Sequence, residues 1–427
     1  MATLALRGRF GQSAMRAASI MLLSVIAACA APKVAVAPPP PPVVVAPPKP
    51  EAAPVIQQNK VAVLLPLTGA NAAVGQSIAN AANMALLDSG DKHINLRVYD
   101  TASGGAAAAA SRAVADGARL FLGPLLAGDV RAVEGIASAN GIPIISYSND
   151  AELAGDGVYI MGLQPAQSIA RVVGYAAAHG VSRFAALIPE GTYGQRATTA
   201  FLRSVEAGGG RVVAIKTYTR EPAKMIAAAR SVTDYDARMA KAATTNAVRP
   251  DGTIAPVTDR LGPVAFQALL IADSGSVAAA FGKPLAQFGA PAGSVTLLGT
   301  DLWNNEPALK NSAALTGALF AAVPDGHFDQ LAGRYRTMFG STPSRLASFG
   351  YDSVLLVNSL AGKWPVETPF PRDALSNQEG FSGIDGVFRF GPSGVAERGF
   401  EVQQIGAGRI VTVSSAPKTL RSEAPAQ

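Results

Sequence analysis

Short apolar runs of strand length alternate with segments of helical spacing from residue 60 onward. Residues 61–65 and 94–99 are such runs, and between them the apolar side chains of residues 76–87 recur at helical spacing. Continuous apolar runs are typical of strands buried on both faces of a parallel sheet that is covered by helices. The pattern continues with predicted helices 106–116 and 129–139 and predicted strands 119–122 and 143–146.

A second series of the same kind begins near residue 165. It consists of predicted helices 165–178, 193–207, 222–243 and 276–287 and predicted strands 184–188, 211–217, 266–272 and 295–298. Two βα series of this size predict two α/β lobes. Toward the end of the chain, residues 387–390 and 400–405 flank the turn sequence Gly-Pro-Ser-Gly and predict a hairpin. Residues 415–427 read as a disordered tail.

One segment, residues 233–263, interrupts the second series before the strand at 266–272. It contains the turn sequence Arg-Pro-Asp-Gly at residues 249–252. A connection of this length is either functional or a mobile, solvated insertion. The sequence leaves both interpretations open.

The first 28 residues have the order of a secretory signal peptide. A basic, acid-free start is followed by the apolar run of residues 17–26, which is too short to span a membrane. The run ends in Ile-Ala-Ala before Cys29, the only cysteine of the chain. Small residues fit the protease site and the thiol takes the diacylglycerol, so we predict a signal peptide at 1–28 and lipidation of Cys29. An ordinary cleavage site with an incidental cysteine is the alternative.

Residues 29–59 carry the predicted lipidated cysteine and a proline-rich tether. Prolines concentrate between residues 32 and 54, including five in succession at 38–42, and such a segment cannot build a core. An extended polyproline chain of this length reaches at most roughly 90 Å at about 3.1 Å per residue. Because Ala30 follows the cysteine, where an aspartate would signal inner-membrane retention, we expect an outer-membrane anchor facing the periplasm. The predicted folded body is residues 60–414.

Composition argues against several function classes. A single cysteine allows no intramolecular disulfide, and the three histidines are scattered without ligand spacing, so neither a metal site nor another cofactor is expected. No nucleophile and base are arranged for catalysis, so the chain is predicted not to be an enzyme. An envelope hydrolase is therefore the least favoured of the three functions considered. The formal net charge of +6 falls to +3 without the three signal-peptide arginines, and no Lys/Arg cluster suggests nucleic acid.

Several motifs carry a family resemblance. Residues 61–69 (VAVLLPLTG) with Gly75-Gln76 resemble the opening of type I periplasmic binding proteins of the leucine-binding family, and residues 121–124, 141–146 and 192–194 follow in the same order. The lipidation signal of residues 26–29, the tether and three later motifs narrow the resemblance; these motifs are residues 298–303, 348–352 and 383–390. The whole set resembles penicillin-binding-protein activator lipoproteins of the LpoA type, in the form that has only the binding-protein-like domain. The resemblance covers about residues 60–414.

The resemblance implies an α/β type I periplasmic binding protein fold, with two interleaved Rossmann-like lobes around a central cleft. Lobe 1 would take about residues 60–165 and 322–382, and lobe 2 about residues 166–321 and 383–414. It also implies a lipid-anchored periplasmic regulator that binds and stimulates a bifunctional peptidoglycan synthase, a class A penicillin-binding protein. The alternative is a solute-binding lipoprotein of an ABC importer for branched-chain type amino acids.

The predicted cleft offers five candidate contacts for a small amino-acid-like ligand. Ligands in such folds lie beyond the carboxyl ends of the strands. Hydroxyls there would bind a ligand carboxylate, and a carboxylate would bind its ammonium group. The loop Leu125–Ala127, where amino-acid-binding members present serines, supplies no hydroxyl, so an altered cleft is favoured. The candidate contacts are Thr68, Ser146, Ser148, Tyr193 and Asp301.

Overall fold

The computed structural model describes residues 57–90, 93–242, 244–248, 250–258, 261–304 and 306–420. The predicted signal peptide, Cys29 and nearly all of the predicted tether lie outside these residues. Within them, no helix combines the length and the apolar character needed to cross a membrane.

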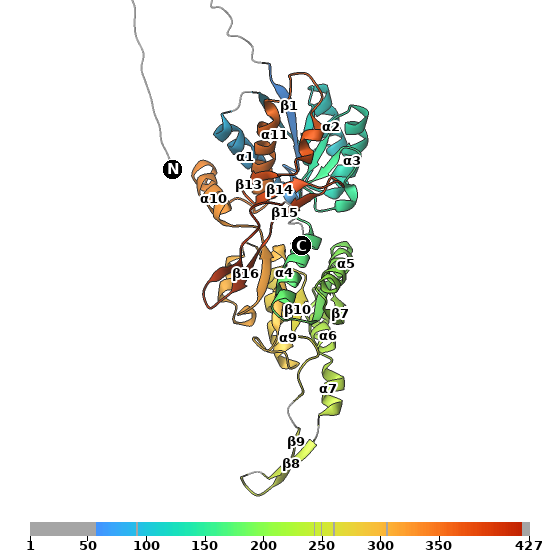
Figure 1. The fold of residues 1–427 in the computed structure, drawn as a ribbon, viewed down its shortest axis with the longest axis vertical. Coiled ribbons are helices and arrows are strands. Elements are labelled where there is room, and N and C mark those ends of the chain that lie inside the picture. Colours follow the sequence, from blue (N-terminus) through green and yellow to red (C-terminus); the bar gives the residue numbers. More distant parts are fainter. Residues whose placement is uncertain are drawn as a thin grey trace, which may run out of the picture. The chain divides into compact units, whose positions relative to one another are not determined.

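The sheet of the first lobe has five parallel strands in the order β2-β1-β3-β4-β5 (Figure 1). Alternate residues of β1 enter two separate cores: Val61, Val63 and Leu65 face one, and Ala62 and Leu64 the other. Both faces are therefore buried, which is why the strand sequence shows no polar alternation. The strands are β1 (Asn59–Leu65), β2 (Ile94–Asp100), β3 (Leu120–Leu122), β4 (Ile144–Ser146) and β5 (Val158–Ile160).

Helices cover both faces of this sheet. On one face α1 (Ala72–Ser89) packs closely against α11 (Ala347–Ala361), with α10 (Gly326–Phe339) beside them. On the other face lie α2 (Ala106–Ala115) and α3 (Ala127–Ala139). The first lobe thus takes α10 and α11 from a part of the sequence that follows the second lobe.

The sheet of the second lobe has seven strands in the order β17-β16-β12-β11-β10-β6-β7. Five of them are parallel; at one edge β16 pairs antiparallel with β12, and β17 pairs antiparallel with β16. The strands are β6 (Arg183–Pro189), β7 (Arg211–Tyr218), β10 (Ala268–Ile271), β11 (Thr296–Gly299), β12 (Leu319–Ala322), β16 (Glu401–Ile405) and β17 (Ile410–Ser414).

Helices α4 (Pro165–Ala178) and α5 (Thr192–Ala207) cover one face of the second sheet. Helices α6 (Pro222–Val232), α8 (Gly275–Ala280) and α9 (Gly282–Gln287) cover the other face. The predicted single helix at 276–287 is wrong, because the chain turns at Phe281 between α8 and α9. The other predicted elements of both series are confirmed, with shifted ends, except in the segment after α6.

The chain crosses between the lobes three times, and the last crossing differs from the prediction. The first crossing follows β5 and the second follows β12, close to the predicted boundaries at 165 and 322. The third lies between Arg398 and Glu401 instead of near Ile384, because Phe388, Phe390 and Ala396 pack in the first lobe's core. Residues 383–398 therefore belong with the first lobe.

The predicted hairpin between residues 387–390 and 400–405 is wrong for the same reason. Strand β14 (Gly386–Phe390) pairs with β13 (Phe381–Gly383) and β15 (Ala396–Arg398), and these form a separate three-stranded sheet. Strand β16 pairs instead with β12 and β17 in the second lobe.

The segment after α6 has regular structure of its own. The predicted helix 222–243 is interrupted at Asp234, which is in the left-handed region with φ 49°, and a new helix α7 (Tyr235–Lys241) follows. Two paired antiparallel strands come next, β8 (Thr244–Val248) and β9 (Ile254–Thr258). The segment that the sequence left open as a functional or a mobile loop therefore contains a helix and a hairpin.

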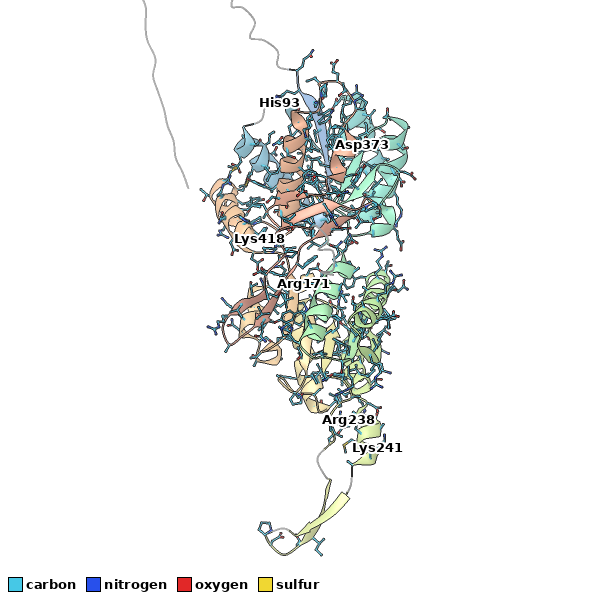
Figure 2. All side chains as sticks on the ribbon, in the orientation of Figure 1. His93, Arg171, Arg238, Lys241, Asp373 and Lys418 are labelled. Atoms are coloured by element: carbon cyan, nitrogen blue, oxygen red, sulfur yellow. The ribbon has the colours of Figure 1, made fainter. Side chains whose placement is uncertain are left out.

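The described part of the predicted disordered tail, residues 415–420, packs against the second lobe. Arg171 of α4, labelled in Figure 2, donates to the Ser414 hydroxyl at 2.6 Å and to the Ser415 carbonyl at 3.3 Å. Pro417 lies against Gly399, where a β-carbon would meet its ring at 3.0 Å. The prediction of disorder from residue 415 is therefore wrong for these residues.

Candidate functional site

All five predicted contact residues lie at the carboxyl edges of the two parallel sheets. Parallel strands place their carboxyl ends at one edge, so the loops after β1 and β4 meet in the first lobe. The loops after β6 and β11 do the same in the second lobe.

A glycine in the first turn allows close packing at the start of α1 in the first lobe and of α5 in the second. A β-carbon on Gly75, in the first turn of α1, would lie 1.9 Å from the Pro66 carbonyl oxygen, and one on Gly194 in α5 would lie 1.7 Å from that of Pro189. Only glycine permits this close approach of helix to strand end. The glycines of two resembling motifs therefore set how tightly each helix closes over its strand.

The hydroxyls of the three first-lobe candidates form hydrogen bonds within the first lobe. Thr68 donates to a carboxylate oxygen of Asp100 at 2.8 Å. The Ser146 hydroxyl donates to the Pro124 carbonyl and accepts from the Ser148 N–H, both at 3.0 Å. The Ser148 hydroxyl accepts from the Asp150 N–H at 3.1 Å. Both serines are buried. Their hydroxyls form turn contacts typical of serine in such loops.

An ion pair joins the two lobes at the cleft. Asp150, which follows the Ser146–Ser148 turn, accepts from Arg196 of α5 at 2.6 Å and from Arg131 of α3 at 3.0 Å. Its carboxylate is 8% exposed, whereas the Arg196 side chain is 25% exposed. The Glu152 N–H also donates to Asp150, at 3.1 Å, and it uses the same oxygen as Arg196. A charged contact within the protein thus occupies a position where the fold places ligands.

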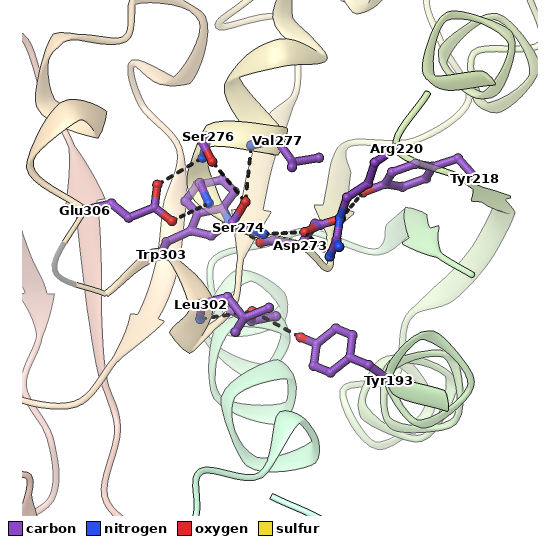
Figure 3. Close-up of polar contacts among 12 residues, drawn as sticks. Tyr193, Tyr218, Arg220, Asp273, Ser274, Ser276, Val277, Leu302, Trp303 and Glu306 are labelled. Atoms are coloured by element: carbon purple, nitrogen blue, oxygen red, sulfur yellow. Dashed lines mark hydrogen bonds and ion pairs between the residues drawn. The ribbon is translucent and has the colours of Figure 1, made fainter. Parts of the chain in front are cut away.

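The two second-lobe candidates, Tyr193 and Asp301, lie close together. The Tyr193 hydroxyl is 3.5 Å from the Thr300 hydroxyl (Figure 3). Burial raises the pKa of Tyr193, and the neighbouring Asp301 charge raises it further. Burial also raises the pKa of Asp301, and the Ser168 hydroxyl only partly offsets that rise. One Asp301 carboxylate oxygen is buried with no hydrogen-bond partner among the described residues. These two candidates are not in contact with the three in the first lobe.

A second network satisfies the polar groups beyond β10. Asp273 accepts from Arg220 through both Nε at 3.0 Å and Nη2 at 2.9 Å, and from the Tyr218 hydroxyl at 2.9 Å (Figure 3). Burial raises the pKa of Tyr218, and the Asp273 carboxylate adds to this rise. Trp303 donates its indole N–H to the Asp273 carbonyl at 2.9 Å. Asp273 is thus fully engaged within the lobe.

Two cavities that share lining residues adjoin the cross-lobe ion pair. One, of about 390 Å³, is lined by Arg131 and Asp150 from the first lobe and by Tyr193 and Arg196 from the second. The other, of about 670 Å³, runs between α4 and α5 over alanine side chains. Among the described residues, no group of three or more His, Cys, Asp or Glu side chains could hold a metal ion.

Three buried charged side chains, Asp352, Asp385 and Arg398, lie with the partly exposed Arg345 where the β13–β14 turn meets α11. Asp352 accepts from the Ile384 N–H at 2.6 Å, and Asp385 accepts from Arg345 at 2.5 Å. Arg398 donates to the Met161 carbonyl at 3.1 Å, next to the first crossing. Burial and the nearby Asp385 raise the pKa of Asp352 to about 7, although the Arg398 charge opposes the rise.

Aromatic rings hold Arg398 in this cluster. Its guanidinium lies 4.8 Å from the Phe388 ring centre and 5.4 Å from that of Phe349. Two of its nitrogens have no hydrogen-bond partner among the described residues. The cluster therefore depends on charge balance and ring stacking in addition to hydrogen bonds.

Sequence reasoning missed the cross-lobe ion pair, the Asp273 network and this buried cluster. Their members are far apart in the chain, for example 46 residues between Asp150 and Arg196. No local spacing signals such contacts, because they form only when the chain folds.

Comparisons with known proteins give one family and one fold. The sequence profile of a family described as Periplasmic binding protein matches residues 58–409. An uncharacterised protein of Rickettsia prowazekii (strain Madrid E) is 32% identical over 137 residues, which are 32% of this chain and 37% of that protein. The matched stretch is thus little more than a third of that relative.

Solved structures with the same fold include ABC transporter proteins and LpoA. A putative branched-chain amino acid ABC transporter protein from Rhodospirillum rubrum has a TM-score of 0.67 and 20% identity, covering 83% of this chain and 100% of that one. A solute binding protein from Rhodopseudomonas palustris BisB5, in complex with 3,4-dihydroxybenzoic acid, has a TM-score of 0.60 and 19% identity, covering 84% and 96%. Full-length LpoA from Haemophilus influenzae has a TM-score of 0.59 and 19% identity, and the match covers 84% of this chain but only 59% of LpoA. At these identities the similarity establishes the fold.

Proposed function

Because the chain belongs to the periplasmic binding protein family and has the family's type I α/β fold, we propose that it acts as a lipid-anchored periplasmic regulator. In this role it binds a bifunctional peptidoglycan synthase, a class A penicillin-binding protein, and stimulates it without performing chemistry itself. The fold alone supports both regulation and solute binding, so the choice between them rests on the cleft.

The contact between Asp150 and Arg196 is the observation that carries the proposal. It joins the lobes at the cleft through the protein's own side chains, at 2.6 Å. Ser146 and Ser148 are engaged in their turn, and Leu125–Ala127 supplies no hydroxyl. A cleft arranged in this way favours a protein that contacts another macromolecule over one that closes around an amino acid.

The anchor completes the proposed function. Lipidation at Cys29 would hold the chain at the outer membrane, and the proline-rich segment would let the body reach a partner roughly 90 Å away. Labelling cells with a palmitate analogue tests the anchor. We expect label on the wild-type chain and none on Cys29→Ser, and equal labelling of the two would contradict lipidation at this residue.

The proposed stimulation is tested with purified components. The mature chain is added to the class A penicillin-binding protein of the same organism, and glycan polymerisation and peptide crosslinking are followed separately. We expect at least one of the two rates to rise several-fold. Unchanged rates, together with no detectable binding, would rule out the proposed function.

Tyr193 and Asp301 support a second candidate, which is a solute-binding role. One Asp301 oxygen is buried without a partner in the described part of the chain, and a cavity of about 390 Å³ lies beside Tyr193. An ammonium group is the chemistry that such an oxygen would accept. Thermal-shift screening against amino acids distinguishes the two functions: a several-degree rise with one of them would favour solute binding, and no shift would favour the regulator.

A further inference from the structure

The chain from Thr233 to Gly262 forms a projection from the second lobe, which we call the arm. It contains α7, β8 and β9, and Figure 1 shows β8 and β9 beyond α7, away from the seven-stranded sheet. In the part of the chain that the structure describes, these two strands pair only with each other. The arm is therefore attached to the lobe at its base alone.

Arg238 fixes that base. Its guanidinium donates to the carbonyls of Thr233 and Phe288 at 3.0 Å each and to the carbonyl of Gly262 at 2.9 Å. Both ends of the arm are thus joined to the lobe by one side chain, which Figure 2 labels beside Lys241. Tyr235 adds an edge-to-face contact with the Phe288 ring at 5.1 Å. Hydrogen bonds and a ring contact therefore fix the base of the arm to the lobe.

The two strands of the arm lack the support that an isolated hairpin needs. A two-stranded hairpin is marginally stable in water without a third strand or a packed face. The sequences TTNAV and IAPVT carry no charge, and Ile254 at the start of β9 is 69% exposed. Strand β9 contains Pro256, which has no N–H to donate, whereas every residue of β8 has one. Strand β8 therefore offers the more complete edge for pairing.

A cavity of about 480 Å³ lies where the arm rejoins the lobe. Its lining includes Pro263 and Phe266, which lead from the arm into β10, and Arg183, which begins β6. Arg183 donates through Nε to the Ala265 carbonyl at 2.8 Å and forms no ion pair with a described carboxylate. Its terminal nitrogens are suited to bind a carboxylate in the fork geometry of a guanidinium.

The structure assigns a docking surface to the arm and this cavity. We propose that it receives a partner protein whose acidic surface carries an open strand edge. That edge pairs with β8 by strand addition, and a partner carboxylate binds Arg183. The assignment rests on the proposed function, so the partner is the peptidoglycan synthase.

A second copy of this chain fits the surface less well. Basic side chains outnumber acidic ones in the second lobe, so two such lobes would repel each other. Charge therefore favours an acidic partner of a different sequence.

The test compares the affinity of the full mature chain for the class A penicillin-binding protein with that of three variants. In the first variant a Gly-Ser linker replaces residues 243–260, which leaves Arg238 and its three carbonyl partners in place. The second is Arg183→Glu, which keeps the arm. The third is the control Arg119→Glu, an exposed arginine that precedes β3 in the first lobe. Thermal unfolding of each variant verifies that its lobes remain folded.

We expect the linker variant to bind at least tenfold more weakly, Arg183→Glu several-fold more weakly, and Arg119→Glu like the wild type. Hydrogen exchange in the wild-type complex should slow at the β8 amides. Wild-type affinity of both the linker variant and Arg183→Glu, or β8 exchange that the partner leaves unchanged, would overturn the docking surface and leave the proposed function standing. A wild-type chain that does not bind the synthase would overturn both.

Discussion

Removing the Arg196 guanidinium should loosen the contact between the lobes. Arg196→Ala deletes the shorter of two ion pairs to Asp150, a carboxylate that is only 8% exposed. Breaking a fully buried pair costs about 3–5 kcal/mol because a charge is left uncompensated. Here Asp150 keeps Arg131 at 3.0 Å and the Glu152 N–H at 3.1 Å, and Arg196 itself is partly exposed. We therefore expect a loss of about 1–2 kcal/mol in the free energy of unfolding.

Thermal and solution measurements follow this loss. With lobes of this size, about 1–2 kcal/mol corresponds to a Tm lower by about 2–8 °C. Small-angle scattering should show a larger radius of gyration for the variant, because the lobes are no longer held at the cleft. High salt should move the wild type in the same direction, since Arg196 is exposed enough to be screened.

The control lies on the same helix. Arg203 of α5 is exposed and forms no ion pair with a described carboxylate, so Arg203→Ala should change stability by less than about 0.5 kcal/mol. A double-mutant cycle of Arg196→Ala with Asp150→Asn should give a coupling of about 1 kcal/mol. If Arg196→Ala melts and scatters like Arg203→Ala, the ion pair does not hold the cleft and the reasoning fails.

Three further changes test the site and the fold. The pKa of Asp352 is about 7 in the folded chain, above the unfolded value near 3.9, so ionisation of this carboxyl lowers the stability of the fold. As pH rises from about 4 to about 7, the Tm of the wild type should therefore fall relative to that of Asp352→Asn. Parallel curves of Tm against pH would contradict the raised pKa. Arg398→Ala should lower the free energy of unfolding by about 1–3 kcal/mol in urea titrations, because Asp352 and Asp385 lose a nearby positive charge although Asp385 keeps its ion pair with Arg345, and an unchanged value would refute this. Gly194→Ala should lower Tm strongly, because its β-carbon would meet the Pro189 carbonyl, whereas Gly174→Ala in the open middle of α4 should gain about 0.5–1 kcal/mol; similar effects would contradict the packing argument.

The parallel-sheet architecture could be predicted because a strand buried on both faces appears as an apolar run in the local sequence. Residues 61–65 of β1 and 184–188 of β6 pack on both faces of their sheets, so each of these runs is entirely apolar and is visible without knowing its neighbours. Pairing partners leave no such signal. Strand β14 pairs with β15 and not with β16 because Phe388 and Phe390 enter the first lobe's core, a choice set by contacts far away in the chain. The end of α6 was missed because Asp234 adopts positive φ where sequence rules expect glycine.

The sequence predicted where the candidate residues lie, but not which of their polar groups are free to bind a ligand. Topology alone puts Thr68, Ser146 and Tyr193 at strand ends. Whether a hydroxyl there is available depends on its neighbours, and Ser146 and Ser148 are engaged in a turn that the sequence does not reveal. The cross-lobe pair of Asp150 and Arg196 could not be predicted, since each residue alone reads as an ordinary surface charge.

The cleft and the proposed docking surface lie at opposite ends of the same strand, and this separation yields a last prediction. Strand β6 begins at Arg183, beside the arm, and its carboxyl end leads through Gly194 to Arg196 at the cleft. Seven residues at about 3.3 Å each separate the two ends by about 20 Å, and they share no contact. Their effects on synthase binding should therefore add within about 0.5 kcal/mol in a double variant of Arg183→Glu and Arg196→Ala. A larger coupling in the measured affinities would refute this independence, because the partner would then be sensing closure of the lobes as a transport protein's cleft senses its solute.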